Sequence, residues 1–317
     1  PRMNVADLRT KGWEASITWG DSFTLASKPF NYRVMAGIGD NTSKVTKYDN
    51  PNRTLTDPYE GQQLGEIWGY VVDGYFKTDE EARNYKVDQS FVNQMINASA
   101  LDNGLHAGDL KFVDLDGNNK IEQTTSANDR KDMKVIGNSL PRYNYNFGIS
   151  ADWYGIDFSV LFQGIGKQNW YPGAETSMFW GPYSRPYASF IPSDFMSQVW
   201  SEENTNAYFP RPRGYVALGS NRELAVVNTK YLQNLAYCRL KNLSIGYTLP
   251  DKWLSKIGFE KIRVYFSGEN LLTFTKLHSD YIDPEQASAS NSWKTSKSDA
   301  NIYPWAKTYS FGVDITF

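Results

Sequence analysis

An acidic loop in the first half of the sequence carries the residue types best suited to holding a metal ion. Oxygen-bearing side chains recur at every second position, as in a calcium loop of the EF-hand type. The candidate ligands are Asp114, Asp116, Asn118, the backbone carbonyl of Lys120, and Glu122. The match is incomplete, because Asn119 stands where such a loop has glycine and Thr125 where it has a bidentate glutamate. A structural Ca²⁺ or Mg²⁺ site and an ion-free turn held by side-chain to backbone bonds both remain open, and no cofactor is required.

Aromatic side chains form the second group of candidate functional residues. They are concentrated between residues 168 and 187, where they alternate with glycine and proline. Flat rings with a polar edge are suited to stacking on sugar faces, and they are equally suited to packing on one another or on a partner protein. The candidate substrate-binding residues are Trp170, Tyr171, Trp180, Tyr183 and Tyr187.

Several other kinds of chemistry find no support in the sequence. Cys238, His106 and His278 are scattered, so neither a disulfide framework nor a Cys/His zinc site is available. No nucleophile with a nearby base, no pair of facing carboxylates and no phosphate-binding loop stands out, so we expect a protein that is not an enzyme. The 33 Lys and Arg nearly balance the 35 Asp and Glu, and the sequence has no basic run. We therefore expect no nucleic-acid partner, because phosphate binding needs concentrated positive charge.

The elements that position these residues are strands with strict two-residue alternation. The final segment, 309–317, has Tyr, Phe, Val, Ile and Phe on one face and Ser, Gly, Asp and Thr on the other. Six further segments alternate in the same way: 13–19, 32–38, 143–153, 156–162, 243–249 and 262–266. The longest match the roughly ten residues of a tilted strand that crosses a bilayer. A transmembrane barrel therefore competes with a large soluble sandwich, while the absence of a long apolar run excludes a membrane-spanning helix. From the sequence we also expect no signal peptide before Pro1.

The connections between these strands favour the barrel, because short and long connections alternate. Residues 21–29, 154–155 and 250–259 are short connections, whereas 41–140, 167–230 and 273–305 are long. Outer-membrane barrels have short periplasmic turns and long extracellular loops. The sequence therefore predicts an all-β fold: about seven long antiparallel strands from the C-terminal section of a large transmembrane β-barrel, with 41–140 and 167–230 as long extracellular loops. Because seven strands leave two open edges, we expect the remaining strands to lie outside this chain.

Short sequence motifs along the whole chain resemble those of one family in their order and spacing. They are GEIWGY at 65–70, GDLKF at 108–112, GNSLP at 137–141, RLKNLSIGY at 239–247, GENL at 268–271 and DPE at 283–285. Together they are similar to the SusC/RagA-like TonB-dependent outer-membrane transporters of Bacteroidetes.

This resemblance implies a barrel of about 22 strands filled by a plug domain, which this chain does not include. It also implies partners: a SusD-like surface lipoprotein over the mouth, the TonB complex acting on the plug, the remaining barrel segments, and outer-membrane lipid. The implied function is active import of oligosaccharides, or of peptides in some members, across the cell outer membrane. The alternative from the residues alone is a secreted soluble glycan-binding sandwich.

The last strand carries one further prediction. Tyr309, Phe311 and Phe317 lie on its apolar face, and the strand resembles the terminal signal read by the barrel-assembly machinery. An aromatic anchor at the periplasmic water interface would produce the same residues.

Overall fold

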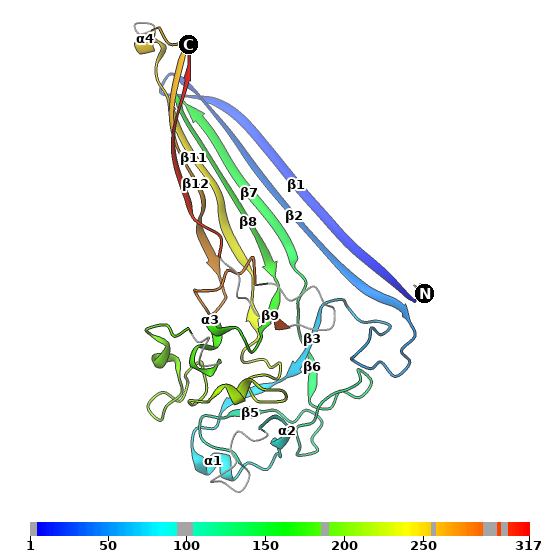
Figure 1. The fold of residues 1–317 in the computed structure, drawn as a ribbon. Coiled ribbons are helices and arrows are strands. Elements are labelled where there is room, and N and C mark those ends of the chain that lie inside the picture. Colours follow the sequence, from blue (N-terminus) through cyan, green and yellow to red (C-terminus); the bar gives the residue numbers. More distant parts are fainter. Residues whose placement is uncertain (1–4, 94–103, 185–189, 255–257, 288–296, 299–303) are drawn as a thin grey trace.

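One antiparallel sheet of seven strands dominates the computed structural model, which describes residues 5–93, 104–184, 190–254, 258–287, 297–298 and 304–317 (Figure 1). Its strands follow the order of the chain, so each one pairs with its predecessor in the sheet. They are β1 (Ala6–Leu25), β2 (Lys28–Tyr48), β7 (Arg142–Trp153), β8 (Ile156–Lys167), β11 (Tyr237–Thr248), β12 (Lys261–Thr275) and β14 (Thr308–Thr316). The number, order and type of the predicted strands are thus confirmed.

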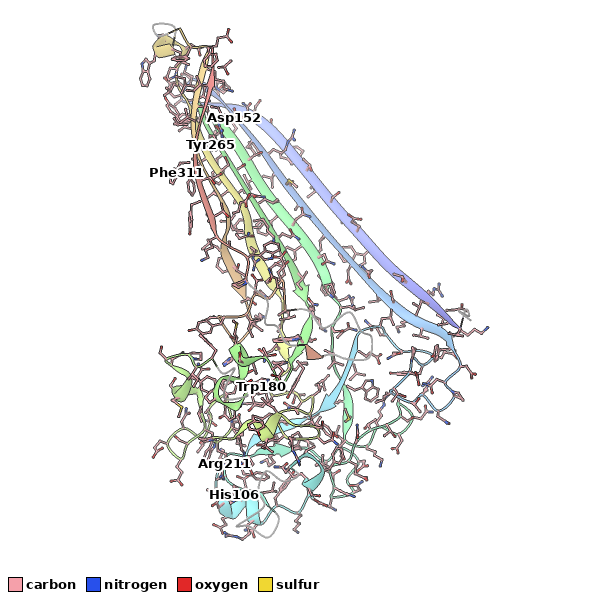
Figure 2. All side chains as sticks on the ribbon, viewed as in Figure 1. His106, Asp152, Trp180, Arg211, Tyr265 and Phe311 are labelled. Atoms are coloured by element: carbon pink, nitrogen blue, oxygen red, sulfur yellow. The ribbon has the colours of Figure 1, made fainter. Side chains whose placement is uncertain are left out.

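The two faces of the sheet differ in chemistry because strand register aligns like residues. On one face Ile149 lies directly opposite Val34 and Val160, and it is 45% exposed. Phe311 on the same face is 83% exposed and points away from the sheet in Figure 2. On the other face a row of five serines crosses five neighbouring strands: Ser150, Ser159, Ser244, Ser267 and Ser310.

The exposed apolar face decides between the two predicted architectures. A soluble sandwich would bury these side chains against a second sheet. The other sheets among the described residues have only two or three strands, and the apolar face stays open. The sandwich alternative is therefore wrong, and the section of a barrel is the architecture observed.

Short and long connections lie at opposite ends of the sheet, as predicted (Figure 1). The turn between β1 and β2 holds Ala26 and Ser27 at φ values of 48° and 60°. The turn between β7 and β8 likewise has Tyr154 and Gly155 at 49° and 85°, the backbone shape of tight hairpins whose twist matches that of the strands. A short helix, α4 (Asp251–Leu254), follows β11 at the same end.

The first hairpin is longer than the sequence predicts. Its strands β1 and β2 have 20 and 21 residues, so most of 21–29 and all of 41–48, which we expected to be connections, are paired strand. The reason is that the backbone ladder can continue where the side chains carry no apolar alternation. Apolar periodicity therefore marks only the middle part of this hairpin.

The described residues within 49–141, 168–236 and 276–287 fold together at the other end of the sheet, and we call this region the loop body. Figure 1 shows it below the strands. Its elements are β3 (Glu66–Tyr70), β4 (Val72–Tyr75), α1 (Asp79–Arg83), α2 (Ser90–Asn93), β5 (Leu110–Phe112), β6 (Met133–Asn138), β9 (Asn169–Pro172), α3 (Ser177–Trp180), η1 (Gly181–Tyr183), η3 (Phe195–Gln198), η4 (Tyr215–Leu218) and β10 (Gln233–Asn234). The small strand β13 (Lys297–Ser298) pairs with β9.

The main apolar core lies in the loop body and not in the sheet. The first two long connections share it, since the Tyr70 N–H donates to the Val227 carbonyl at 2.9 Å and the Thr229 N–H donates back to the Tyr70 carbonyl at 3.0 Å. Side chains from all three segments of the body form one buried cluster, among them Phe112, Trp180 and Ile282. Among the described helices, none has the length and hydropathy that crossing a membrane requires.

Candidate functional site

The polar face of the sheet forms the wall of the candidate site. Asn144, Asn146, Ser150 and Asp152 occupy alternate positions on β7, opposite to the apolar residues of that strand. A hollow of about 880 Å³ lies at the end of the wall near the loop body, with Asn144 and Asn146 in its lining. A second hollow of about 790 Å³ lies further along and includes Ser150 and Asp152. These four residues thus line two broad, open depressions.

At the end of the wall away from the loop body, a cluster of ion pairs connects β8, β12 and β14 and passes over the intervening strand β11. Arg263 on β12 donates to both carboxylate oxygens of Asp157 on β8, from Nη2 at 2.6 Å and from Nε at 2.9 Å. Its Nη1 lies 3.3 Å from Asp314 on β14. Gly246 on the intervening strand β11 makes this possible, because a Cβ there would collide with both charged groups. The sequence analysis missed this cluster, although charged residues flanked by apolar ones, as in Ile-Arg-Val, were its local signal.

The predicted aromatic residues lie inside the loop body. Trp170, Tyr171 and Trp180 have no exposed surface, and Tyr183 is 1% exposed. Their polar atoms bond to the backbone: Tyr171 Oη donates to the Leu224 carbonyl at 2.8 Å, and Trp180 Nε1 to the Gly173 carbonyl at 3.0 Å. Tyr187 lies outside the described residues. A ring without exposed surface offers no face to a sugar, so the four described rings occupy the packing role that the sequence left open.

Polar groups inside this aromatic core are arranged around Asn228. Its Nδ2 donates to Tyr171 Oη at 2.8 Å, and its Oδ1 accepts the N–H groups of Lys230 and Tyr231 at 3.0 and 3.1 Å. Burial raises the pKa of the Tyr171 and Tyr231 hydroxyls well above the ordinary value. Burial also lowers the pKa of Lys230, whose ammonium lies 4.7 Å from the centre of the Tyr75 ring. The core is therefore fixed by directional bonds as well as by apolar packing.

The acidic loop closes on itself through side-chain to backbone bonds. The carboxylate of Asp114 accepts the N–H groups of Gly117 and Asn119, both at 2.7 Å. Asn119 has a φ of 62°, so asparagine supplies the left-handed conformation expected of glycine at that place. The Lys120 N–H donates to Asn118 Oδ1 at 2.8 Å.

A third carboxylate joins this loop from outside the predicted set. Carboxylate oxygens of Asp114, Asp116 and Asp132 lie within 4.8 Å of one another. Asp132 has no exposed surface, and it accepts the N–H groups of Leu115 at 2.8 Å and Glu122 at 2.7 Å. Glu122 instead directs its carboxylate to Lys131, at 3.4 Å. Asp132 stands ten residues beyond Glu122, so no calcium-loop spacing identifies it.

The charges of this cluster respond to burial and to one another. Burial raises the pKa of Asp132, and the neighbouring carboxylates of Asp116 and Asp114 raise it further. Burial also opposes the ionisation of Asp114, but the N–H groups of Asn119 and Gly117 outweigh it and hold the pKa of that carboxyl below its ordinary value. Three clustered carboxylates match the oxygen ligands that Ca²⁺ and Mg²⁺ prefer, and the internal bonds match an ion-free turn. Both alternatives therefore stay open.

The residues of the predicted assembly signal lie on the open apolar face at the edge of the sheet. Tyr309 is 61% exposed, and Phe317 is 84% exposed, close to the 83% of Phe311 between them. Phe311 lies beside Phe266 of β12, with ring centres 5.2 Å apart. Recognition by an assembly machinery remains a prediction.

Comparison with known proteins relates the whole described architecture to one group. TonB-dependent receptor P3 of Formosa agariphila is 27% identical over 99% of this chain and 29% of its own length. TonB-dependent receptor SusC of Bacteroides thetaiotaomicron is 22% identical over 99% of this chain and 27% of its own length. No family model matches the chain. The chain thus spans less than a third of the length of the curated relatives it matches.

Solved structures agree on the fold. The RagAB peptide importer in its "open-open" state superposes with a TM-score of 0.65 at 20% identity, over 99% of this chain and 29% of the other. The "closed-closed" state of the same importer gives a TM-score of 0.61 at 21% identity. The seven-stranded sheet with its loop body therefore matches part of a barrel of this kind.

Proposed function

We propose that this chain, which is similar in sequence to TonB-dependent receptors and in fold to the RagAB importer, is a SusC/RagA-like receptor and forms one sector of the wall and mouth of an outer-membrane importer. The observation that carries this proposal is the contrast between the two faces of the sheet. An open apolar face of this extent is stable against acyl chains and unfavourable in water. The opposite face, with its serine row and its asparagines, tolerates a water-filled interior.

The loop body lies on the extracellular side in this proposal. The short turns at the other end of the sheet then face the periplasm, as in outer-membrane barrels generally. A SusD-like surface lipoprotein would close over the body, and TonB would act through a plug domain in the barrel. The polar wall serves as a passage and carries out no covalent step.

Oligosaccharides are the proposed cargo, and peptides are the second candidate. The resemblance of the sequence motifs to the SusC/RagA-like family supports the first, while the solved importer with this fold is named a peptide importer. The test deletes the gene in the native host and measures growth on defined oligosaccharides and on defined peptides. The class of nutrient on which growth fails distinguishes the two candidates. A growth defect that complementation repairs identifies the cargo class.

Energy dependence and location complete this test. Import should stop when TonB is removed, and the full-length protein should fractionate with the outer membrane and unfold on heating in detergent. Recovery of the full-length protein in the soluble fraction without detergent would contradict the proposal.

A further inference from the structure

The segment 276–287 is the part of the loop body that follows β12. It contacts both the rest of the body and the sheet, and we call it the strap. On its body side Leu277, Ile282 and Ala287 are buried in the aromatic core. The His278 N–H donates to Gln233 Oε1 at 3.2 Å, and Ser279 Oγ donates to the Met178 carbonyl at 2.8 Å. The strap therefore moves with the loop body.

On its sheet side the strap is held by ion pairs to β11. Arg239 Nη2 lies 2.7 Å from Asp283 Oδ1, and its Nη1 lies 2.7 Å from Glu285 Oε2. Lys241 Nζ adds a contact of 2.8 Å to Glu285 Oε1. We call these four residues the clamp.

Each side of the clamp is also held in position by a hydrogen bond, within the sheet for one side and within the strap for the other. Arg239 Nε donates to Thr273 Oγ1 on β12 at 3.0 Å, which fixes the guanidinium on the wall. Asp283 Oδ1 accepts the N–H of Glu285 at 2.9 Å, which fixes the turn of the strap. The side chains of Arg239 and Asp283 are only 3% and 6% exposed. Separating the two residues would leave each charge buried without its partner, which is costly. The paired arrangement of Arg239 and Asp283 is therefore strongly favoured over any other.

We propose that the clamp sets the position of the loop body against the barrel wall, and that Arg239 is a positioning residue for cargo binding at the mouth. This inference rests on the proposed function, because it assigns the loop body to the mouth of an importer. Apolar packing and the hydrogen bonds of His278 and Ser279 hold the strap to the rest of the body, and the clamp joins it to β11. The planar guanidinium donates to two carboxylates in a fixed geometry and so selects a single register between body and wall.

The test uses the full-length transporter in its native outer membrane with its partners. The variants are Arg239→Met, which removes both ion pairs, and Arg239→Lys, which keeps the charge but not the fork of donors. The control is Lys252→Met, which removes an exposed positive charge from α4 at the other end of the sheet. Hydrogen exchange of residues 277–287 and the concentration dependence of uptake are measured for each.

If the clamp positions the loop body, Arg239→Met should exchange the amide hydrogens of 277–287 faster. The substrate concentration for half-maximal uptake should rise several-fold, while the amount of protein at the cell surface stays unchanged. Arg239→Lys should be intermediate, and Lys252→Met should change neither quantity. Unchanged exchange in Arg239→Met would overturn the clamp, and faster exchange with an unchanged uptake curve would overturn the positioning role.

Two further arms keep the test decisive. If Arg239→Met fails to assemble, Glu285→Gln weakens the same contact while leaving the pair between Arg239 and Asp283, and the same two measurements apply. If the unmodified protein shows no TonB-dependent uptake, the proposed function fails, whereas the exchange measurement still tests the clamp itself.

Discussion

The sheet and the loop body are built from the same kinds of aromatic and aliphatic residues, but they use them in opposite ways. In the loop body Trp170 and Trp180 are fully buried among other side chains. In the sheet Trp13 and Trp19 are 52% and 60% exposed. The body therefore carries its own core, whereas the sheet depends on its backbone ladder and on surroundings that accept apolar side chains. Composition cannot reveal this difference, because only the spacing of the residues separates the two regions.

The largest expected effect comes from removing a core ring of the loop body. Trp180→Ala should destabilise the body by about 3–5 kcal/mol, because it leaves a cavity beside Phe179 and Tyr231 and removes the bond to the Gly173 carbonyl. Hydrogen exchange of the assembled transporter should show lost protection in the body and retained protection in the sheet. Met196→Ala, at a side chain that is 66% exposed, is the control and should have little effect. Equal loss of protection in both regions would show that they do not behave as separate units.

A charge on the apolar face of the sheet should have the next largest effect. Ile149→Arg should cost about 2–4 kcal/mol if that face meets acyl chains near the middle of the bilayer. Ser150→Arg is the matched control, since the neighbouring residue points to the polar face and its charge would remain in water. The fraction of heat-modifiable, fully assembled protein in the outer membrane measures the outcome. Similar assembly of the two variants would contradict the assignment of the faces.

Added Ca²⁺ should have a smaller effect, confined to the loop body. If the cluster of Asp114, Asp116 and Asp132 binds the ion, a concentration ten times the Kd stabilises the folded form by about 1.4 kcal/mol. The increase in thermal stability of the purified transporter should disappear in Asp114→Asn and persist in Asp251→Asn, at the far end of the sheet. An equal response in all three proteins would leave the ion-free turn as the description of this loop.

The smallest effect concerns pH in the absence of divalent cations. Because the pKa of Asp132 is raised by burial, the folded loop keeps a proton that the unfolded chain has already lost above its ordinary value of 3.8. The contribution of Asp132 to stability therefore falls as the pH rises through this window. We expect Asp132→Asn to gain thermal stability relative to the unmodified protein between pH 4 and pH 7 in a chelating buffer. A constant difference between the two proteins across that range would contradict the shift.

The sequence predicted the sheet well because sheet formation here is periodic and local. The alternation around Ile149 and Phe311 indicates strand, face and approximate length without knowledge of any distant contact. The ends of the first hairpin were missed, since residues such as Lys11 and Thr42 pair through backbone bonds and show no apolar period.

The loop body was less predictable because its contacts join residues far apart in the chain. Aromatic composition gave no indication that Trp180 packs against Tyr231, and calcium-loop spacing could not include Asp132. The sequence motifs that contain Arg239 and Asp283 were recognised separately, but these two residues are 44 positions apart in the chain, and their contact was not predicted. Local pattern identifies the residues in such cases, and only the folded chain shows which of them meet.

The five serines on the polar face also limit what the wall can select. Each side chain ends in a short neutral hydroxyl that both donates and accepts, so a solute at that height meets neither a charge of one sign nor a bulky obstacle. A sugar and a peptide would find comparable hydrogen-bonding partners there. In the proposed importer, discrimination between cargoes would then be completed at the entrance, before a molecule reaches this depth.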